Sequence, residues 1–394
     1  MKPSRVFWFA PINSSKYASF VEGATFLGAA TRKVINLALA LRGRGVHTFV
    51  VAMPVVGSRV VKYICRAKIY RDKVPVIKPP STHSTAINRL LAAFYYFYIA
   101  AFKVRRSGVV VLYNFHLEYF FACFYLLIIG NRAFLELEDF PVKDGTLRGV
   151  YNSLSYCLIR PICNSSVIAV SDEVASISSA CKALVIQGII SREDACAEDN
   201  ILKPSVHQGV VIHYGGSIVP DTGLDIFVDA VRLIREQCSD KCIVFEVTGF
   251  GNISRILDLA NVNSNYNAIV NFHSGLPPSG YLQVLRGAHA SLSLKNPSSV
   301  YGYTTFPSKV IEIAANGILL ISSSIPGVCK IFGDAALFMN TYSASELASK
   351  IIWVHDNLKE ANELAVLSKV KCLAKFSLDG VGIQLENFLL AHKQ

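Results

Sequence analysis

Residues 293–317 read SLKNPSSVYGYTTFPSKVIEIAANG, and the fold assignment starts from this stretch. The alternating apolar segment 290–294 predicts a strand, a polar loop with proline and glycine follows, and a helix is expected to begin near Pro307-Ser308 and to end at Gly317. A strand, a loop and a helix in this order often bind anions, because the first amide groups of a helix have no partner inside it.

Three side chains near the start of this helix are candidate ligand contacts. Ser308 and Lys309 can offer amide groups and a fixed cation to a phosphate group. Glu312 follows one turn later on the same face, where a carboxylate can accept hydrogen bonds from a ribose diol. The same residues also describe an ordinary solvated helix start with a serine cap and a Lys-Glu pair. This helix alone leaves both interpretations open.

The composition limits the class of protein. The chain has 394 residues, which suits two domains, and 52% of them are hydrophobic. The two longest apolar runs, 90–102 and 119–129, are shorter than the roughly 18 residues of a spanning helix. The ten cysteines form no CxxC pair and no Cys/His cluster with zinc spacing. We therefore expect a cytoplasmic protein with free thiols and no metal site.

Positive charge is concentrated near the N-terminus. Residues 1–110 contain 18 Lys and Arg against two acids, a net charge of +16, whereas the whole chain carries +11. Cations such as Arg89 and Lys103 flank the aromatic run 90–102, so we expect peripheral attachment of the segment 59–106 to an anionic membrane surface, the inner face of the cell membrane. The alternative is a solvated basic surface that maintains solubility. No nucleic-acid-binding module is visible, and nucleic acid is not an expected partner.

Strands and helices alternate through both halves of the chain, which predicts two doubly wound α/β domains with parallel sheets. In the first half we expect strands at 6–10, 46–53, 109–114, 133–137 and 167–170, helices at 31–41, 118–129 and 146–161, and a helical aromatic region up to Arg106. In the second half we expect strands at 210–214, 242–248, 268–272, 290–294 and 318–322, and helices at 224–237, 253–259, 280–287 and from 344 onward.

The domain boundaries follow from a polar, aperiodic segment at 191–208, which is the expected linker. We predict an N-terminal domain over 1–195 that carries the basic aromatic membrane-facing region, and a second domain over 205–375. A C-terminal helix over 376–394 is a candidate for packing back on the N-terminal domain. The second domain has glycines just after its predicted strands, in loops where a backbone must approach a ligand closely; these are Gly215, Gly216, Gly249 and Gly251.

The second half resembles the family-four-type glycosyltransferases. The matching stretches are 214–223 (YGGSIVPDTG), 247–251 (VTGFG), 270–276 (VNFHSGL) and 306–317 (FPSKVIEIAANG). A subgroup with a Pro-Ser-Lys-x-x-Glu donor motif, of the bacterial surface-polysaccharide and lipopolysaccharide type, is the most similar. The resemblance implies the GT-B architecture, in which two facing Rossmann-like domains hold a nucleotide sugar in the cleft between them.

The resemblance also implies roles for single residues. Glu312 would bind the nucleotide ribose, and Ser308, Lys309 and Val310 would contact the diphosphate. The glycines would lie beneath the nucleotide, Gly216 and Gly251 above all.

In the first half, His116 ends a strand where many members of the family place a histidine near the transferred sugar. A satisfied structural histidine is an equally good interpretation. Glu138 and Asp139 end the next strand and either bind acceptor hydroxyls or cap a helix.

Two departures from the family pattern affect the site. The family usually has an acidic residue eight positions before Glu312, in contact with the donor sugar, and this chain has Thr304. It also usually has Arg and Lys in the first loop of the donor domain, and this chain has Ser217 and Thr222. Lys309 is therefore expected to supply much of the positive charge opposite the phosphates.

The resulting expectation is a hexosyltransferase-like enzyme that uses a nucleotide diphosphate sugar, a saccharide or lipid-linked acceptor, no cofactor and no metal, with retention at the anomeric carbon. Its candidate catalytic residues are His116, Lys309 and Glu312. A degenerate GT-B protein that binds a nucleotide sugar or acts as a scaffold is the alternative. A third class, a nucleotide-sugar epimerase, would require acid/base carboxylates that the sequence does not reveal.

Overall fold

A computed structural model describes most of the chain, which divides into two compact units, Met1–Ser191 with Ser377–Gln394, and Arg192–Phe376. No helix in the described part is long and apolar enough to cross a membrane. The described residues are 5–12, 28–53, 67–71, 74–79, 82, 84–104, 108–139, 141, 145–190, 209–263, 266–299, 302 and 305–390.

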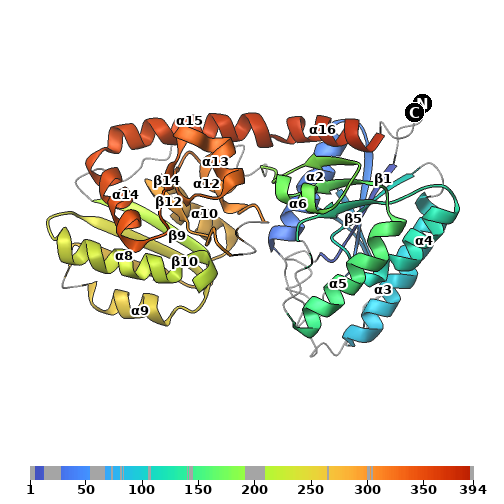
Figure 1. Cartoon of the computed structure of the whole chain (residues 1–394), viewed down its shortest axis with the longest axis horizontal. Helices are drawn as coiled ribbons and strands as arrows, with labels where there is room; N and C mark the ends of the chain where they lie inside the picture. Colours follow the sequence, from blue (N-terminus) through green and yellow to red (C-terminus); the bar gives the residue numbers. More distant parts are fainter. Residues whose placement is uncertain are drawn as a thin grey trace. The chain divides into compact units, whose positions relative to one another are not determined.

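The first unit contains an eight-stranded sheet in the order β3-β4-β2-β1-β5-β6-β7-β8 (Figure 1). Neighbouring strands in this sheet are parallel except for the antiparallel pair β3 and β4. The order reverses between β1 and β5, and the carboxyl ends of strands at such a point are where α/β sheets bind ligands. The strands are β1 (Arg5–Ala10), β2 (His47–Ala52), β3 (Ala67–Arg71), β4 (Val74–Lys78), β5 (Gly108–Tyr113), β6 (Phe134–Leu137), β7 (Ser166–Ala169) and β8 (Lys182–Val185).

The helices of the first unit include α16 from the C-terminal end of the chain, which packs on α2 (Figure 1). Val381, Leu385 and Leu389 of α16 are buried in the same core as Val34 of α2. A Cβ on Gly382 would lie 2.7 Å from the Ala40 carbonyl oxygen, so the two backbones approach closely. The helices are α2 (Gly28–Gly43), α3 (Thr85–Ile99), α4 (Phe120–Ile128), α5 (Leu147–Ile159), α6 (Asp172–Ile177) and α16 (Leu378–Leu390), and a π-helical turn, Ala100–Val104, continues α3.

The second unit contains six parallel strands in the order β11-β10-β9-β12-β13-β14. This is the Rossmann order, with the reversal between β9 and β12. The strands are β9 (Val210–Ile218), β10 (Ile243–Gly251), β11 (Ala268–His273), β12 (Ala290–Ser293), β13 (Leu319–Ser323) and β14 (Leu337–Met339). The helices are α8 (Leu224–Gln237), α9 (Ser254–Asn261), α10 (Pro278–Arg286), α12 (Lys309–Ala315), α13 (Pro326–Phe332), α14 (Ala344–Asp356) and α15 (Leu358–Phe376).

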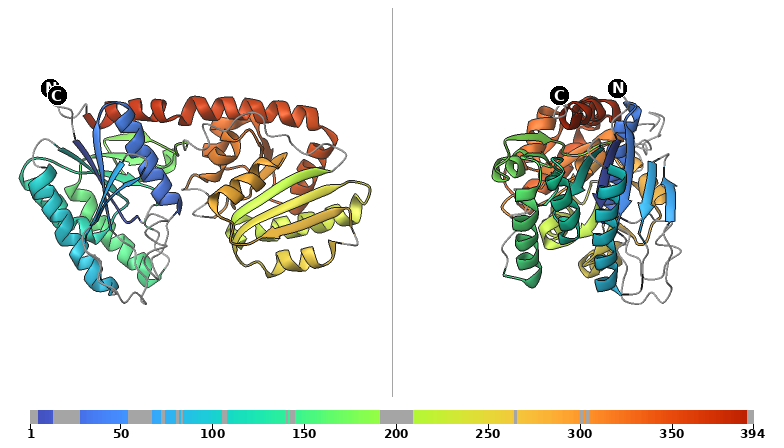
Figure 2. Two further views of the ribbon diagram at one scale, coloured as in Figure 1. Left: turned by 180° about the vertical axis from the view of Figure 1, so that it is seen from behind. Right: turned by 90° about the vertical axis from the view of Figure 1, so that its right-hand side faces the viewer.

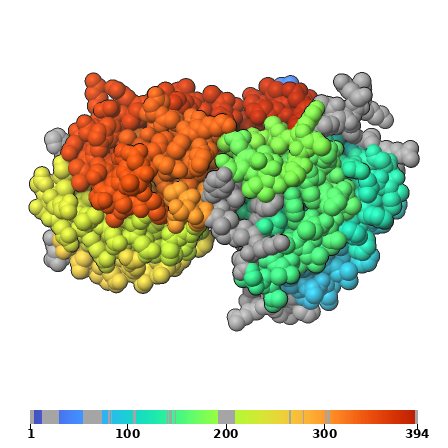
Figure 3. Space-filling model, viewed as in Figure 1, coloured from blue at the N-terminus to red at the C-terminus, as the bar shows by residue number. Residues whose placement is uncertain are grey.

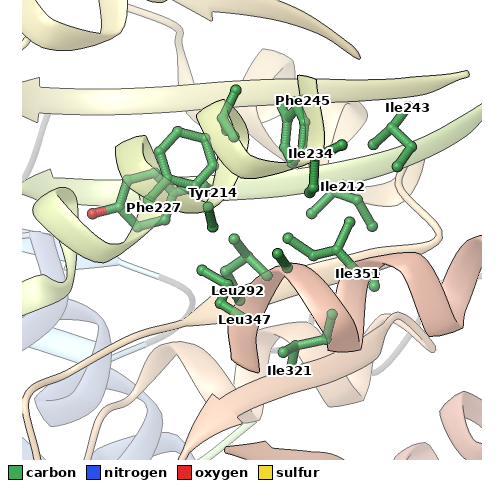
Figure 4. Close-up of a cluster of buried hydrophobic side chains, with 14 of the residues drawn as sticks. Ile212, Tyr214, Phe227, Ile234, Ile243, Phe245, Leu292, Ile321, Leu347 and Ile351 are labelled. Carbon is green, nitrogen blue, oxygen red and sulfur yellow. The ribbon is translucent and has the colours of Figure 1, made fainter. Parts of the chain in front are cut away.

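The core of the second unit fixes the two strands at its switch point. Tyr214 of β9 stacks on Phe227 of α8 with ring centroids 4.5 Å apart, and Leu292 of β12 lies in the same buried cluster (Figure 4). Helix α14 adds Leu347 and Ile351 to the cluster. Burial of such side chains contributes about 1.5–3 kcal/mol each, so the carboxyl ends of β9 and β12 are held in place by a packed core.

The prediction of two doubly wound α/β domains is confirmed, with differences in detail. The region up to Arg106 is not helical throughout, because the hairpin β3–β4 lies within it. Its segments 67–71 (AKIYR) and 74–78 (VPVIK) contain cations and a proline, unlike the apolar runs that marked the other strands. The strands β8 and β14 and the helices α6 and α13 were not predicted, and the expected linker 191–208 lies outside the described residues.

The four glycines Gly215, Gly216, Gly249 and Gly251 lie within strands and not in loops, contrary to the sequence-based expectation. Strands β9 and β10 continue to Ile218 and Gly251 and pair through them, with Gly216 opposite Gly249. Both glycines have positive φ, 103° and 134°. Without side chains the two backbones can pair at a distance that any Cβ would prevent, which extends the strands beyond the predicted ends.

We expect Gly249→Ala to destabilise the second unit strongly, because its Cβ would overlap with the Gly216 carbonyl oxygen. The expected loss in the free energy of unfolding is about 3 kcal/mol, measured by urea denaturation. Gly275→Ala is the matched control, since Gly275 also has positive φ but no atom within 4 Å of an added Cβ, and it should cost about 1 kcal/mol. Equal losses would show that backbone conformation alone matters at Gly249.

Candidate functional site

The ammonium group of Lys309 occupies the space above Gly216. A Cβ on Gly216 would overlap with Lys309 Nζ and Cε, so the lysine reaches this position only because residue 216 has no side chain. Gly216 is near the carboxyl end of β9, and Lys309 begins α12, which follows the loop after β12. The contact therefore lies at the point of the sheet where the strand order reverses, the usual ligand position in this topology.

Burial controls the charge of Lys309. It lowers the pKa of the ammonium group from 10.5 to about 8, and the Glu312 carboxylate opposes part of the shift. The group thus remains mainly protonated at neutral pH although it has lost much of its hydration. A partly desolvated cation of this kind binds an anion more strongly than an exposed surface lysine does.

Glu312 lies one turn after Lys309 and is oriented by α10. Its Oε2 atom accepts a hydrogen bond from the Tyr281 hydroxyl at 2.9 Å. A second link between the two helices runs from Arg286 Nε to Asn316 Oδ1 at 2.8 Å, and Asn316 Nδ2 donates to the Glu312 carbonyl oxygen. The position of the carboxylate is therefore fixed by α10 as well as by α12.

The backbone amide groups at the start of α12 are not all available to a ligand. Ser308 has helical backbone angles and makes no side-chain cap hydrogen bond. The Val310 amide donates to the Pro307 carbonyl oxygen at 3.1 Å, and the Val310 side chain is fully buried. The charged Lys309 side chain is therefore a stronger candidate for binding a phosphate than the backbone amides at the start of α12.

His213 belongs to the same site, and sequence reasoning missed it. Its Nδ1 lies 2.8 Å from Ser291 Oγ, and its Nε2 lies 2.9 Å from Thr248 Oγ1. Burial lowers the pKa of His213 to about 3, with smaller contributions from Lys309 and His273. The neutral ring joins β9, β10 and β12 directly beside Gly215, where an added Cβ would lie 2.7 Å from the imidazole.

A signal for His213 does exist in the sequence. His213 and Ser291 are opposite each other in the register of β9 and β12. Each interrupts a segment that is otherwise apolar, VVIHY and ASL. Polar residues in buried parallel strands need partners, so the pairing could have been inferred once the strand order was known.

Gly251 and Thr222 have structural roles in the second unit. A Cβ on Gly251 would lie 2.5 Å from the Ile218 carbonyl oxygen, so Gly251 permits strand pairing at the end of β9. Thr222 Oγ1 donates to the Ser217 carbonyl oxygen at 2.6 Å and thus braces the turn after β9. Ser217 is exposed. Thr304 lies outside the described residues.

His116 belongs to the first unit and follows β5 at that unit's switch point. Burial lowers the pKa of His116 to about 4, while Glu118 raises it and Arg89 lowers it further. The ring packs edge-on against Tyr119 at 5.4 Å. The Tyr119 hydroxyl donates to the Phe9 carbonyl oxygen at 3.0 Å, which joins β1 to this end of the sheet. His116 is thus a neutral group on a rigid support.

Glu138 and Asp139 follow β6 and are held by Asn114. Their amide groups donate to Asn114 Oδ1 at 2.8 and 3.3 Å, and Asn114 itself has a positive φ of 56°. The Glu138 carboxylate is ion-paired with Lys33 of α2. Lys33 also lies 3.4 Å from the buried Glu136 carboxylate, whose pKa is raised to about 8 by burial. Within the described ranges, no three His, Cys, Asp or Glu side chains could together hold a metal ion.

Part of the chain matches a known protein family. Residues 209–357 match the family model for glycosyl transferases group 1. The matched segment is just over a third of the chain and contains the whole Lys309 site. No curated protein matches the sequence.

Solved structures resemble nearly the whole chain. HepE from Anabaena in complex with UDP has 13% sequence identity and a TM-score of 0.63, with 98% of this chain and 100% of that chain covered. A glycosyltransferase from Rickettsia africae has 14% identity and a TM-score of 0.66, with both chains fully covered. Sucrose-phosphate synthase from Thermosynechococcus elongatus has 15% identity and a TM-score of 0.65, with 98% of each chain covered. The fold is GT-B. At these identities the likeness establishes the fold alone.

We expect His213 to leave a signature in the pH dependence of stability. Between pH 6.5 and about 3 the unfolded chain protonates this histidine and the folded chain does not, so stability is lost as the pH falls. The His213→Gln variant should lack this contribution, which amounts to at most about 1.4 kcal/mol per pH unit. The measurement is urea denaturation of both proteins at pH 7, 6, 5 and 4. A constant difference between them at all four values would contradict a neutral His213.

Proposed function

We propose that the chain is a glycosyltransferase that moves a sugar from a nucleotide diphosphate sugar to a saccharide or lipid-linked acceptor. The observation that carries the proposal is the desolvated Lys309 ammonium group above Gly216, inside the segment that matches the group 1 model. This position suits the diphosphate of the donor. HepE, a solved structure with the same fold, binds UDP.

Each part of the site has a role in the proposed reaction. When the bond between sugar and diphosphate breaks, negative charge grows on the leaving phosphate oxygens, and Lys309 stabilises this charge electrostatically. Glu312, with one carboxylate oxygen held by Tyr281, accepts hydrogen bonds from the ribose hydroxyls. Because a fixed cation offsets the leaving-group charge, the proposed reaction requires neither a cofactor nor a metal ion.

The finer parts of the proposal concern stereochemistry and acceptor. We propose retention at the anomeric carbon, with the neutral His116 orienting a sugar hydroxyl through a hydrogen bond. The acceptor would be a lipid-linked saccharide of cell-surface polysaccharide or lipopolysaccharide synthesis, at the inner face of the cell membrane. The net charge of +16 in residues 1–110 supports attachment to an anionic membrane.

One observation favours a second candidate, a protein that binds a nucleotide sugar without transferring it. The hydroxyl of Thr222 is committed to backbone groups of its own turn, and Ser217 carries no charge, so this loop offers little to a diphosphate. Release of the nucleoside diphosphate from a labelled nucleotide sugar, with a lipid extract as acceptor source, separates the two functions. Turnover supports the transferase, whereas binding without release supports the second candidate.

We expect one of UDP, GDP, CDP and dTDP to raise the melting temperature of the protein. A ligand at 100 times its dissociation constant stabilises the folded state by about 2.7 kcal/mol, which is several degrees. Lys309→Ala and Glu312→Ala should each remove most of the shift. Lys241→Ala is the control, because Lys241 is a lysine of the same unit that pairs with Asp356 away from this site. A shift that survives both site variants would place the nucleotide elsewhere.

We also expect nucleotide affinity to fall above pH 8. The diphosphate binds the protonated Lys309, and with a pKa of about 8 only a small fraction of the groups remains charged at pH 9. The dissociation constant should therefore rise about tenfold from pH 7 to pH 9, measured by calorimetry. Lys309→Arg keeps its charge throughout and should show a smaller change. Equal pH profiles would mean that the ligand or another group titrates instead.

A further inference from the structure

Helix α3 of the first unit is apolar on its outer face as well as on its inner face. Its inner face buries Ala93, Tyr96 and Ile99, whereas Phe94 is 60% exposed and Leu90 is 56% exposed. A helix that packs on a sheet and faces water on its other side has polar side chains on that outer face. The outward face of α3 is therefore built for an apolar environment.

The neighbouring helices repeat this arrangement. Helix α4 buries Ala122, Cys123 and Leu126 on its inner face and exposes Phe124 and Ile128 on its outer face. Helix α5 exposes four apolar residues at intervals of three and four positions, which forms one continuous stripe along the helix. The exposed large apolar residues of this surface, here called the apolar face, are Ile87, Leu90, Phe94, Phe97, Tyr98, Phe102, Phe121, Phe124, Ile128, Leu147, Val150, Leu154 and Leu158.

The three helices lie side by side (Figures 1 and 2). Phe97 of α3 and Tyr125 of α4 are in edge-to-face contact with ring centroids 5.6 Å apart. Arg89 of α3 lies over the Tyr151 ring of α5 at 4.7 Å. In the space-filling view their light-blue, teal and green atoms are neighbours at the surface (Figure 3). The apolar face is thus one surface and far larger than a few scattered exposed residues.

The charge of this surface indicates its partner. Helices α3, α4 and α5 and the turn Ala100–Val104 contain no aspartate or glutamate. Glu118, just before α4, is buried and ion-paired with Arg89. Lys103 and Arg132 are exposed close to the ends of α3 and α4. Long cationic side chains beside an aromatic surface suit an interface with anionic lipid headgroups.

We propose that the apolar face of α3, α4 and α5 docks on an anionic lipid bilayer, with its Phe and Leu side chains in the headgroup boundary and Lys103 and Arg132 at the phosphates. This places the membrane contact on three helices, two of which lie outside the basic segment 59–106. A soluble partner or a second copy would have to supply an equally large apolar surface, and neither explains the lack of acidic residues. The proposal is independent of sugar transfer.

The test measures co-sedimentation of the full chain with vesicles of phosphatidylcholine and of phosphatidylcholine with 30% phosphatidylglycerol. The variant Phe94→Ser/Phe124→Ser/Leu154→Ser removes one large side chain from each helix and should lower partitioning at least about tenfold. The matched control Leu257→Ser/Val366→Ser/Val370→Ser removes three exposed apolar residues of the second unit and should bind like the original protein. Because all six positions are exposed, the melting temperatures should stay similar.

The charge contribution is measured separately. Lys103→Gln should lower partitioning about fivefold on the anionic vesicles and leave it unchanged on pure phosphatidylcholine. Failure of the original protein to bind either vesicle would overturn the proposal, as would equal losses in the two triple variants. Sedimentation velocity supplies one further outcome. If the original protein is a dimer that ignores vesicles and the first triple variant is a monomer, the apolar face joins two copies instead.

Discussion

The candidate site depends on a missing side chain. Because Gly216 has no Cβ, the Lys309 ammonium group can rest on the backbone of β9 at the switch point of the sheet. The same lack of side chains at Gly216 and Gly249 lets β9 and β10 pair to their ends, so one constraint shapes the strands and places the cation. The site therefore combines a helix that carries the charged group with a sheet that supports it, and such regular elements position a group better than a loop does.

Burial acts on the basic groups in the same direction but with different consequences. It lowers the pKa of His213 to about 3 and that of His116 to about 4, so both rings are neutral across the physiological range. It lowers the pKa of Lys309 only to about 8, which leaves this group mainly charged. In the second unit, one desolvated cation thus lies beside the neutral hydrogen-bonding partners His213 and Thr248. Such a combination favours an anionic ligand and does not attract cations.

Much of the fold could be predicted because the pattern of the sequence repeats. The alternation of short apolar segments with segments of helical periodicity predicted the two Rossmann-like units. Pro307-Ser308 as the helix start and Gly317 as its end predicted the bounds of α12 within one or two residues. The hairpin of β3 and β4 was missed because its segments AKIYR and VPVIK contain cations and a proline, which interrupt the apolar pattern of a buried strand. The ends of β9 and β10 were misjudged because glycine usually marks a loop, whereas here it permits close pairing.

The candidate site was harder to predict, because its contacts join residues far apart in the chain. Lys309 and Glu312 are three residues apart on one helix, so their common face follows from the sequence. The contact of Tyr281 with Glu312 and that of His213 with Ser291 depend on which helices and strands become neighbours, and strand order is not readable from local patterns. The apolar face shows the same limit. The runs of Phe, Tyr and Leu in α3 and α4 are evident, but only the packing shows which of these side chains are buried and which remain exposed on the outer faces of the helices.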